Sequence, residues 1–141
     1  MELNDALEAA RANRESVLVT IRRSGRPQLS NVLHHVDADG LIRISTTAGT
    51  AKFKNLRREP WAALHLDVRN HWSYAVIEGD VTLSEVAAEP DDARLEEPVD
   101  LYRALAGEHD DWADYRAAMV AEQRAVVRIR PARAYGLLRR G

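Results

Sequence analysis

The sequence contains no cysteine among its 141 residues, which excludes disulfides, thiolate zinc sites and cysteine nucleophiles. It has no apolar run close to the ~20 residues that a membrane-spanning helix needs. The net charge is -2, so no overall basic field indicates a nucleic-acid partner. Together these absences favour a soluble, cytoplasmic protein that acts on neither membranes nor nucleic acids.

The common catalytic signatures are also missing. No G-x-S-x-G, Walker A or strand-linked G-x-G-x-x-G motif occurs, so hydrolase, P-loop and Rossmann functions have no motif to support them. His34 and His35 are adjacent and would point to opposite faces of a strand, while His65, His71 and His109 show no ligand spacing. We therefore expect no metal site and no dedicated pair of general acid and base.

What the chain does contain is a single-domain pattern over residues 1–141, in which apolar alternation indicates strands and wider spacing indicates helices. The N-terminal helix is acidic and amphipathic, unlike a signal peptide. The expected helices cover residues 3–13, 50–58, 93–106 and 110–123. The expected strands cover residues 16–22, 28–36, 41–46, 61–68, 72–84, 125–130 and 133–138.

This order of elements predicts an α+β fold, a small closed or split β-barrel of antiparallel strands with peripheral helices. Strands 28–36 and 41–46 are expected to form a hairpin across the turn at residues 37–40. Gly79 is expected to mark a bend or bulge, and Pro98 to interrupt the helix at 93–106. A pure sandwich is the weaker alternative because the helical insert is long.

The segment STTAGTAKFKNLRREP (45–60) predicts an anion-binding pocket, because it ends a strand in hydroxyl residues and then starts a basic helix. Helix N-terminal N–H groups, hydroxyls and an ammonium group can together hold a phosphate. The residues expected to converge there are Ser45, Thr46, Thr47, Thr50 and Lys52. The alternative is a solvated basic helix face that also carries Asn55, Arg57 and Arg58.

A second candidate is Trp72-Ser73-Tyr74, which places two large amphipathic rings around a hydroxyl at the start of a strand. Such rings can flank a planar heterocycle while the hydroxyl bonds its edge. The alternative is that they are aromatic residues of the core or of a dimer interface.

Several long segments carry a resemblance to a known family: GRPQLSNV (25–32), residues 45–60 and HWSYAVIEGDVTL (71–83). Over nearly its whole length the chain resembles the split β-barrel flavin and deazaflavin oxidoreductases that include pyridoxamine 5′-phosphate oxidase. LYRALAGEHDDWADYRAAMV (101–120) and RPARAYGL (130–137) are most similar to the actinobacterial branch that uses coenzyme F-420, a 5-deazaflavin. The resemblance implies an FMN-binding split-barrel fold and a homodimer with shared cofactor pockets.

For the phosphate end of the cofactor, the resemblance implies that Lys52 and Asn55 bind the phosphate and its surroundings. Ser45 and Thr46 would line the phosphate and ribityl region. For the ring end, it implies that Trp72, Ser73 and Tyr74, contributed across the dimer interface, lie near the tricyclic ring. Gln28 and Asn31 of the second strand would line the ring edge.

One departure from the family concerns the residues just before Lys52. Flavin-binding relatives usually carry an arginine there, whereas this chain has Thr50-Ala51, and the missing cation weakens the clamp on FMN. The Thr50 hydroxyl compensates in part, and Lys54, Arg57 or Arg58 are candidates to meet the oligoglutamate tail of F-420. The chain also ends without the basic and aromatic substrate motifs of the pyridoxamine phosphate oxidases, which disfavours that activity.

The resemblance therefore implies an oxidoreductase that transfers hydride from reduced F-420 to a small organic acceptor such as an enone, a quinone or a biliverdin-like compound. Two alternatives stay open at this point. One is an FMN-dependent oxidase or reductase, and the other is a non-catalytic carrier of F-420 or a flavin-like ligand.

Overall fold

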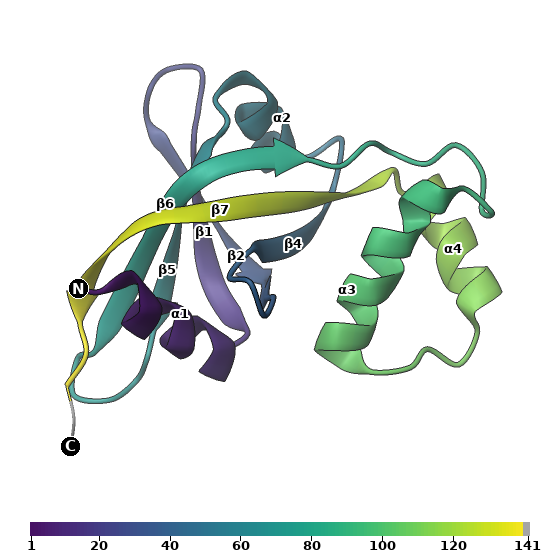
Figure 1. Cartoon of the computed structure of the whole chain (residues 1–141). Coiled ribbons are helices and arrows are strands. Elements are labelled where there is room, and N and C mark those ends of the chain that lie inside the picture. Colours follow the sequence, from purple (N-terminus) through teal and green to yellow (C-terminus); the bar gives the residue numbers. More distant parts are fainter. Residues whose placement is uncertain (140–141) are drawn as a thin grey trace.

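The computed structural model describes residues 1–139 and shows a sheet that curls into a half-barrel (Figure 1). Within these residues seven antiparallel strands follow one another in the order β2-β1-β5-β6-β7-β4-β3. The predicted α+β split barrel is confirmed. The strands are β1 (Glu15–Ile21), β2 (Pro27–Leu33), β3 (His35–Val36), β4 (Ile42–Thr47), β5 (Trp61–Asp67), β6 (Tyr74–Leu83) and β7 (Arg124–Leu137).

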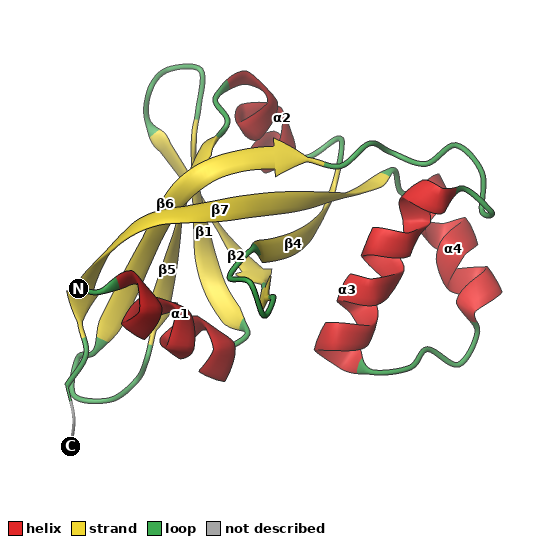
Figure 2. Ribbon diagram, in the orientation of Figure 1, coloured by secondary structure: helices red, strands yellow, loops and turns green. Residues whose placement is uncertain are grey.

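The core fills the inside of the curled sheet. Alternating residues of the strands, such as Leu18, Leu64 and Ile77, are fully buried there, and burying each such side chain contributes roughly 1.5–3 kcal/mol. The helix α1 (Leu3–Ala12) adds the apolar stripe that its sequence predicts, with Ala6 and Leu7 packed into the same core. Figure 2 shows this helix lying alongside the sheet.

The predicted strand 28–36 is in fact two strands at opposite edges of the sheet. β2 pairs with β1, whereas β3 pairs with β4, so the expected hairpin is limited to β3 and β4. At His34 the chain stops pairing with β1 and crosses to the other edge of the sheet. The ring of His34 is buried, with Nδ1 2.7 Å from Ser16 Oγ and Nε2 2.9 Å from the Ala10 carbonyl oxygen. Burial lowers the pKa of His34, which favours a neutral, structural imidazole.

The two strands predicted at 125–130 and 133–138 form one continuous strand, β7, which pairs with β4 and β6. The register shifts between Glu78 and Gly79, and Gly79 lies opposite Pro131. Proline has no N–H to donate to a ladder, so the irregularity absorbs it without ending the strand. The predicted bulge at Gly79 is confirmed.

Between β6 and β7 the chain leaves the barrel and forms what we call the α3–α4 lobe, residues 84–123. It contains a short 3-10 helix (Ala93–Leu95), α3 (Glu96–Ala106) and α4 (Trp112–Ala121). The expected interruption at Pro98 is wrong, because this proline lies in the first turn of α3, where backbone N–H groups have no helical partner. No helix within residues 1–139 is long and apolar enough to cross a membrane.

Candidate functional site

A groove of about 470 Å³ lies where the barrel meets the α3–α4 lobe. The barrel contributes residues 31–33 of β2, the end of β4, the start of β7 and the first turn of α2 (Ala51–Arg58). β2 and β4 approach each other here without pairing in the sheet, so the groove follows the split of the barrel. Helices α3 and α4 form the opposite wall (Figure 1).

The hydroxyl residues predicted for the anion pocket all line this groove, but they are not equivalent. Thr50 caps α2, because its Oγ1 accepts from the Phe53 N–H at 3.4 Å and donates to the Thr47 carbonyl oxygen at 2.8 Å. Thr46 is buried, with its Oγ1 3.2 Å from Thr50 Oγ1. Ser45 and Thr47 lie on the opposite face of β4, toward the lobe. The hydroxyls of Thr46 and Thr50 thus shape the cap, while those of Ser45 and Thr47 are placed for a ligand.

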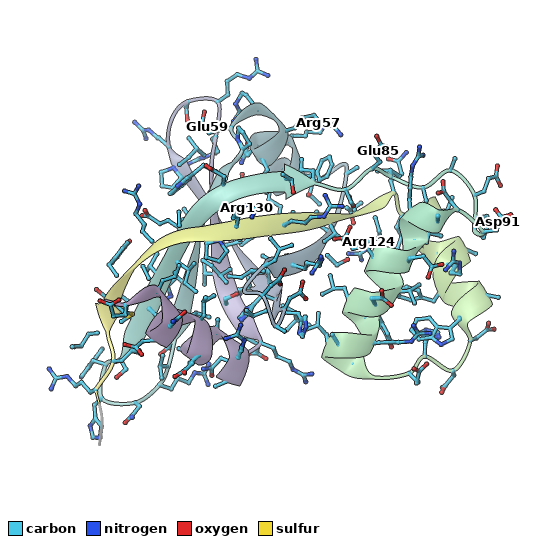
Figure 3. The ribbon with its side chains drawn as sticks, viewed as in Figure 1. Arg57, Glu59, Glu85, Asp91, Arg124 and Arg130 are labelled. Atoms are coloured by element: carbon cyan, nitrogen blue, oxygen red, sulfur yellow. The ribbon has the colours of Figure 1, made fainter. Side chains whose placement is uncertain are left out.

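Among residues 1–139 two cations line the groove, and the sequence predicted one of them. Lys52 comes from the first turn of α2, as expected. Arg124 is the cation that sequence reasoning missed: it lies directly opposite Thr47 in the β4–β7 ladder and so shares its face of the sheet. Figure 3 shows Arg124 at the end of β7 nearest to α3. Its Nη2 also bonds the half-exposed Glu122 at 3.0 Å.

Carboxylates are absent from the groove lining as far as the structure describes the chain. The helix α2 adds the N–H groups of its first turn and the positive end of its dipole. Two cations, oriented N–H groups and hydroxyls, with no carboxylate among the described lining residues, make this groove suited to a phosphate or another anion.

The wall opposite the cations is largely apolar and aromatic. The lobe side chains that form it include Leu101, Tyr102, Leu105 and Met119. Tyr115 belongs to this wall too, and its hydroxyl donates to the Pro98 carbonyl oxygen at 3.2 Å. Burial raises the pKa of Tyr115, so the phenol stays neutral and serves as a hydrophobic surface. The groove therefore combines an anion-binding end with an apolar side.

Asn55 and Gln28 lie together, but they do not line the groove. Asn55 is buried, and its Nδ2 donates to Thr20 Oγ1 at 3.1 Å and to Gln28 Oε1 at 3.3 Å. Arg58 completes the network by donating to Asn55 Oδ1 at 3.2 Å. Within one chain these contacts fix α2 on the barrel. Ala51 is exposed at the first position of α2.

Of the second-strand residues predicted at the ring edge, Asn31 does line the groove. It also lines a larger pocket of about 800 Å³ on the other side of β2, together with Val17, His65 and Asp67. Asn31 thus connects the anion-binding groove to the outer face of the sheet.

Trp72, Ser73 and Tyr74 lie at the turn between β5 and β6, and none of them lines the groove of its own chain. Trp72 is 92% exposed and has a positive φ of 64°. Ser73 is buried, and its Oγ accepts from the Arg139 N–H at 2.8 Å. Tyr74 stacks on His65 with 5.7 Å between ring centroids. One chain therefore keeps these rings apart from Lys52.

Comparison with known proteins gives a consistent picture. The sequence matches the family model described as pyridoxamine 5′-phosphate oxidase over residues 3–138. A conserved hypothetical protein from Mycobacterium tuberculosis has a similar structure, with a TM-score of 0.71 and 23% identity over 96% of this chain and 84% of that one.

Two further solved structures are similar. An F-420 reductase has a TM-score of 0.60 and 22% identity over 91% of this chain and 94% of that one. A pyridoxamine 5′-phosphate oxidase-related, FMN-binding protein from Nostoc punctiforme has a TM-score of 0.62 and 17% identity over 94% of this chain and 80% of that one. At these identities the likeness to the solved structures shows the fold alone.

Proposed function

The chain belongs to the pyridoxamine 5′-phosphate oxidase family, and from this premise we propose that it is a cytoplasmic oxidoreductase that uses reduced coenzyme F-420. The acceptor is a small organic molecule such as an enone, a quinone or a biliverdin-like compound. The observation that carries the proposal is the groove with Lys52 and Arg124, no lining carboxylate and an apolar wall. This donor set fits a phosphate joined to a largely apolar ring system.

When bound, the deazaflavin supplies the chemistry, a two-electron hydride transfer. The chain's own residues act by binding and positioning. Lys52, Arg124 and the N–H groups at the start of α2 would hold the phosphate, and Ser45 and Thr47 would bond the neighbouring hydroxylated chain. The apolar lobe wall excludes water from one side. A proton for the product would come from solvent or, where a second copy brings its rings to the groove, from a Tyr74 hydroxyl. Catalysis rests mainly on orientation of the two reactants.

FMN is the second candidate cofactor, and one observation favours it. The family's arginine before Lys52 is missing, but Arg124 enters the same groove from β7. A second cation near the phosphate offsets the weakened clamp that the sequence implies.

Titrating the purified protein with F-420 and with FMN, followed by fluorescence, tests the proposal. We expect saturable binding of F-420 that is tighter than binding of FMN, and oxidation of reduced F-420 when a suitable acceptor is added. Tighter binding of FMN together with turnover selects the flavin enzyme. F-420 binding without turnover across the enone, quinone and biliverdin-like acceptors selects a carrier. Failure to bind either cofactor contradicts all three functions.

We further propose that the protein acts as a homodimer through the outer face of the sheet. The strand register places five exposed apolar side chains on this one face, namely Leu29, Leu33, Tyr74, Tyr135 and Leu137. Exposed apolar side chains gathered on one face of a sheet are typical of an interface. A second copy on it also offers a route for the partner's rings toward the groove, which Trp72 does not reach within its own chain.

Placing a carboxylate on this face should break the dimer. We expect Tyr135→Glu to sediment near 15.8 kDa, whereas the wild type sediments near twice that mass. Tyr135 is 51% exposed, so the change should leave the core intact. Ala113→Glu, at an exposed position of α4, is the control and should remain dimeric. A wild-type protein that sediments as a single chain would contradict the dimer.

A further inference from the structure

The α3–α4 lobe has a hydrophobic cluster of its own. Its buried residues are Ala87, Leu95, Val99, Tyr115 and Met119, and none of them belongs to the cluster that fills the barrel. Tyr102 and Trp112 add ring contacts, with Tyr102 4.9 Å and Trp112 5.5 Å from Tyr115 between centroids. The lobe is therefore packed as a unit, and its position against the barrel depends on contacts outside this cluster.

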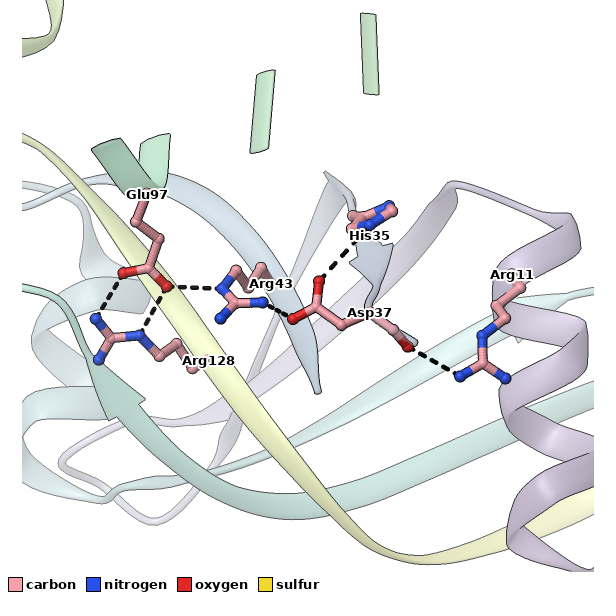
Figure 4. Close-up of polar contacts among 6 residues, drawn as sticks. All are labelled: Arg11, His35, Asp37, Arg43, Glu97 and Arg128. Carbon is pink, nitrogen blue, oxygen red and sulfur yellow. Dashed lines mark hydrogen bonds and ion pairs between the residues drawn. The ribbon is translucent and has the colours of Figure 1, made fainter. Parts of the chain in front are cut away.

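One interaction that holds it there is an ion cluster at the start of α3, centred on Glu97 (Figure 4). Arg128 of β7 donates from Nη2 to Glu97 Oε1 at 2.6 Å and from Nε to Glu97 Oε2 at 2.8 Å. Arg43 of β4 donates from Nε to the same Oε2 at 2.7 Å. Arg43 also pairs with Asp37, whose backbone carbonyl accepts from Arg11 of α1 at 2.9 Å.

Burial and geometry make these contacts stronger than ordinary surface pairs. The side chain of Glu97 is 21% exposed, and those of Arg43 and Arg128 are 25% and 29% exposed. Burial opposes ionisation of Glu97, but hydrogen bonds from Arg128 and Arg43 outweigh it and lower its pKa. A bidentate arginine contact also fixes orientation, which a single exposed pair does not.

Other polar contacts of α3 do not replace this cluster. At the far end of the helix, Arg14 donates to the Leu105 carbonyl oxygen in an exposed contact. Glu96 pairs with Arg116 at 3.3 Å, but this contact joins α3 to α4 within the lobe. Glu97 is thus the side chain through which the start of α3 is fixed to two strands of the barrel.

The same face of β4 and β7 carries both the cluster and the groove. In the antiparallel ladder Arg43 lies opposite Arg128, and Thr47 lies opposite Arg124, four residues away on each strand. Leu101, one helical turn after Glu97, lines the groove directly. The position of α3 at Glu97 therefore sets how closely the apolar wall approaches the cations.

We propose that Glu97 is a positioning residue of the groove: bound by Arg43 and Arg128, it holds the α3–α4 lobe as the wall that closes the cofactor site. The part of this inference that concerns cofactor affinity rests on the proposed function. The part that concerns the lobe does not, because it follows from the contacts alone.

Glu97→Gln tests the inference, since it keeps the side-chain volume and removes the charge that both arginines bind. We expect the variant to bind the cofactor about tenfold more weakly, a loss typical of a mutation that acts through a neighbouring element. We expect faster hydrogen exchange of the amides in α3 and α4, measured by mass spectrometry, and unchanged exchange in β5. Glu96→Gln is the matched control, because its side chain is 65% exposed and does not reach the barrel.

The outcomes separate this proposal from the proposed function. Unchanged exchange in α3 and α4 of Glu97→Gln overturns the role of Glu97. Faster exchange with unchanged affinity for the cofactor that the wild type binds also overturns it, because the lobe would then move without affecting the groove. If the wild type binds neither F-420 nor FMN, the proposed function fails, and lobe exchange still decides whether Glu97 fixes the wall. Loss of protection throughout the barrel would show general destabilisation instead and would likewise count against the proposal.

Discussion

Lys52→Ala is expected to weaken cofactor binding by about 1.5–3 kcal/mol, the range for a charge-assisted hydrogen bond. This corresponds to a roughly 10- to 150-fold higher Kd at 25 °C. The reason is that Lys52 is one of two cations lining a groove whose described residues include no carboxylate. Fluorescence titration with the cofactor that the wild type binds measures the change directly.

Lys54→Ala is the matched control, because Lys54 is the other lysine of the sequence, lies on the same helix and is exposed outside the groove. Titrating with FMN, or with an F-420 form that lacks the glutamate tail, removes any contribution that Lys54 makes to the tail. Under these conditions Lys54→Ala should leave the cofactor affinity close to that of the wild type. Equal effects of the two variants would mean that the groove is not the phosphate site.

Arg124→Ala extends the same experiment to the cation contributed by β7. This variant should lose less cofactor affinity than Lys52→Ala, because Arg124 already bonds Glu122. In the double variant the two losses should not add, since both charges act on one phosphate group. Strict additivity would place the two cations on separate anions.

The largest effect on stability is expected from Gly79→Ala, at the register shift between β6 and β7. A Cβ at this position would overlap the carbonyl group of Arg130, and this neighbour is backbone that no side-chain rotation can move. Overpacking of this kind costs roughly 1–3 kcal/mol, and more where the backbone itself must shift. Chemical denaturation monitored by circular dichroism measures the loss in free energy of unfolding.

Gly49→Ala provides the comparison for the stability measurement. Gly49 lies in the exposed turn between β4 and α2, and a Cβ there would meet no atom within 4 Å. We expect its free energy of unfolding to stay close to that of the wild type. If Gly79→Ala were equally stable, the close approach of β6 and β7 at the bulge would not be a constraint on the fold.

Much of the fold follows from local patterns in the sequence. Alternation predicted the strands around Leu18 and Leu64 and the curled antiparallel sheet, and Gly79 marked the bulge. The errors arose where pairing between segments far apart in the sequence determines the strands. The segment 28–36 reads as one strand, yet burial of His34 divides it between two edges of the sheet. Pro131 reads as a break, yet the bulge opposite it keeps β7 continuous.

The candidate site was predictable only in its local part. Thr50 and Lys52 are close in sequence, so helix-start chemistry identified them. Arg124 is more than seventy residues away, and only the β4–β7 ladder places it opposite Thr47. Glu97 resembles any acidic residue in the first turn of a helix until α3 is seen against the barrel. A pattern within a short window cannot indicate such pairings.

The position of β7 in the sheet has a consequence for the order of events during synthesis. In the part of the chain that the structure describes, β3 and β4 are joined to the other strands only through β7, although they precede it by some eighty residues. On the ribosome, β4 therefore stays unpaired along the edge that binds β7 until residues 124–137 leave the exit tunnel. Such delayed long-range pairing slows folding and exposes strand edges to aggregation. Nascent chains arrested before Arg124 should accordingly depend on chaperones to stay soluble.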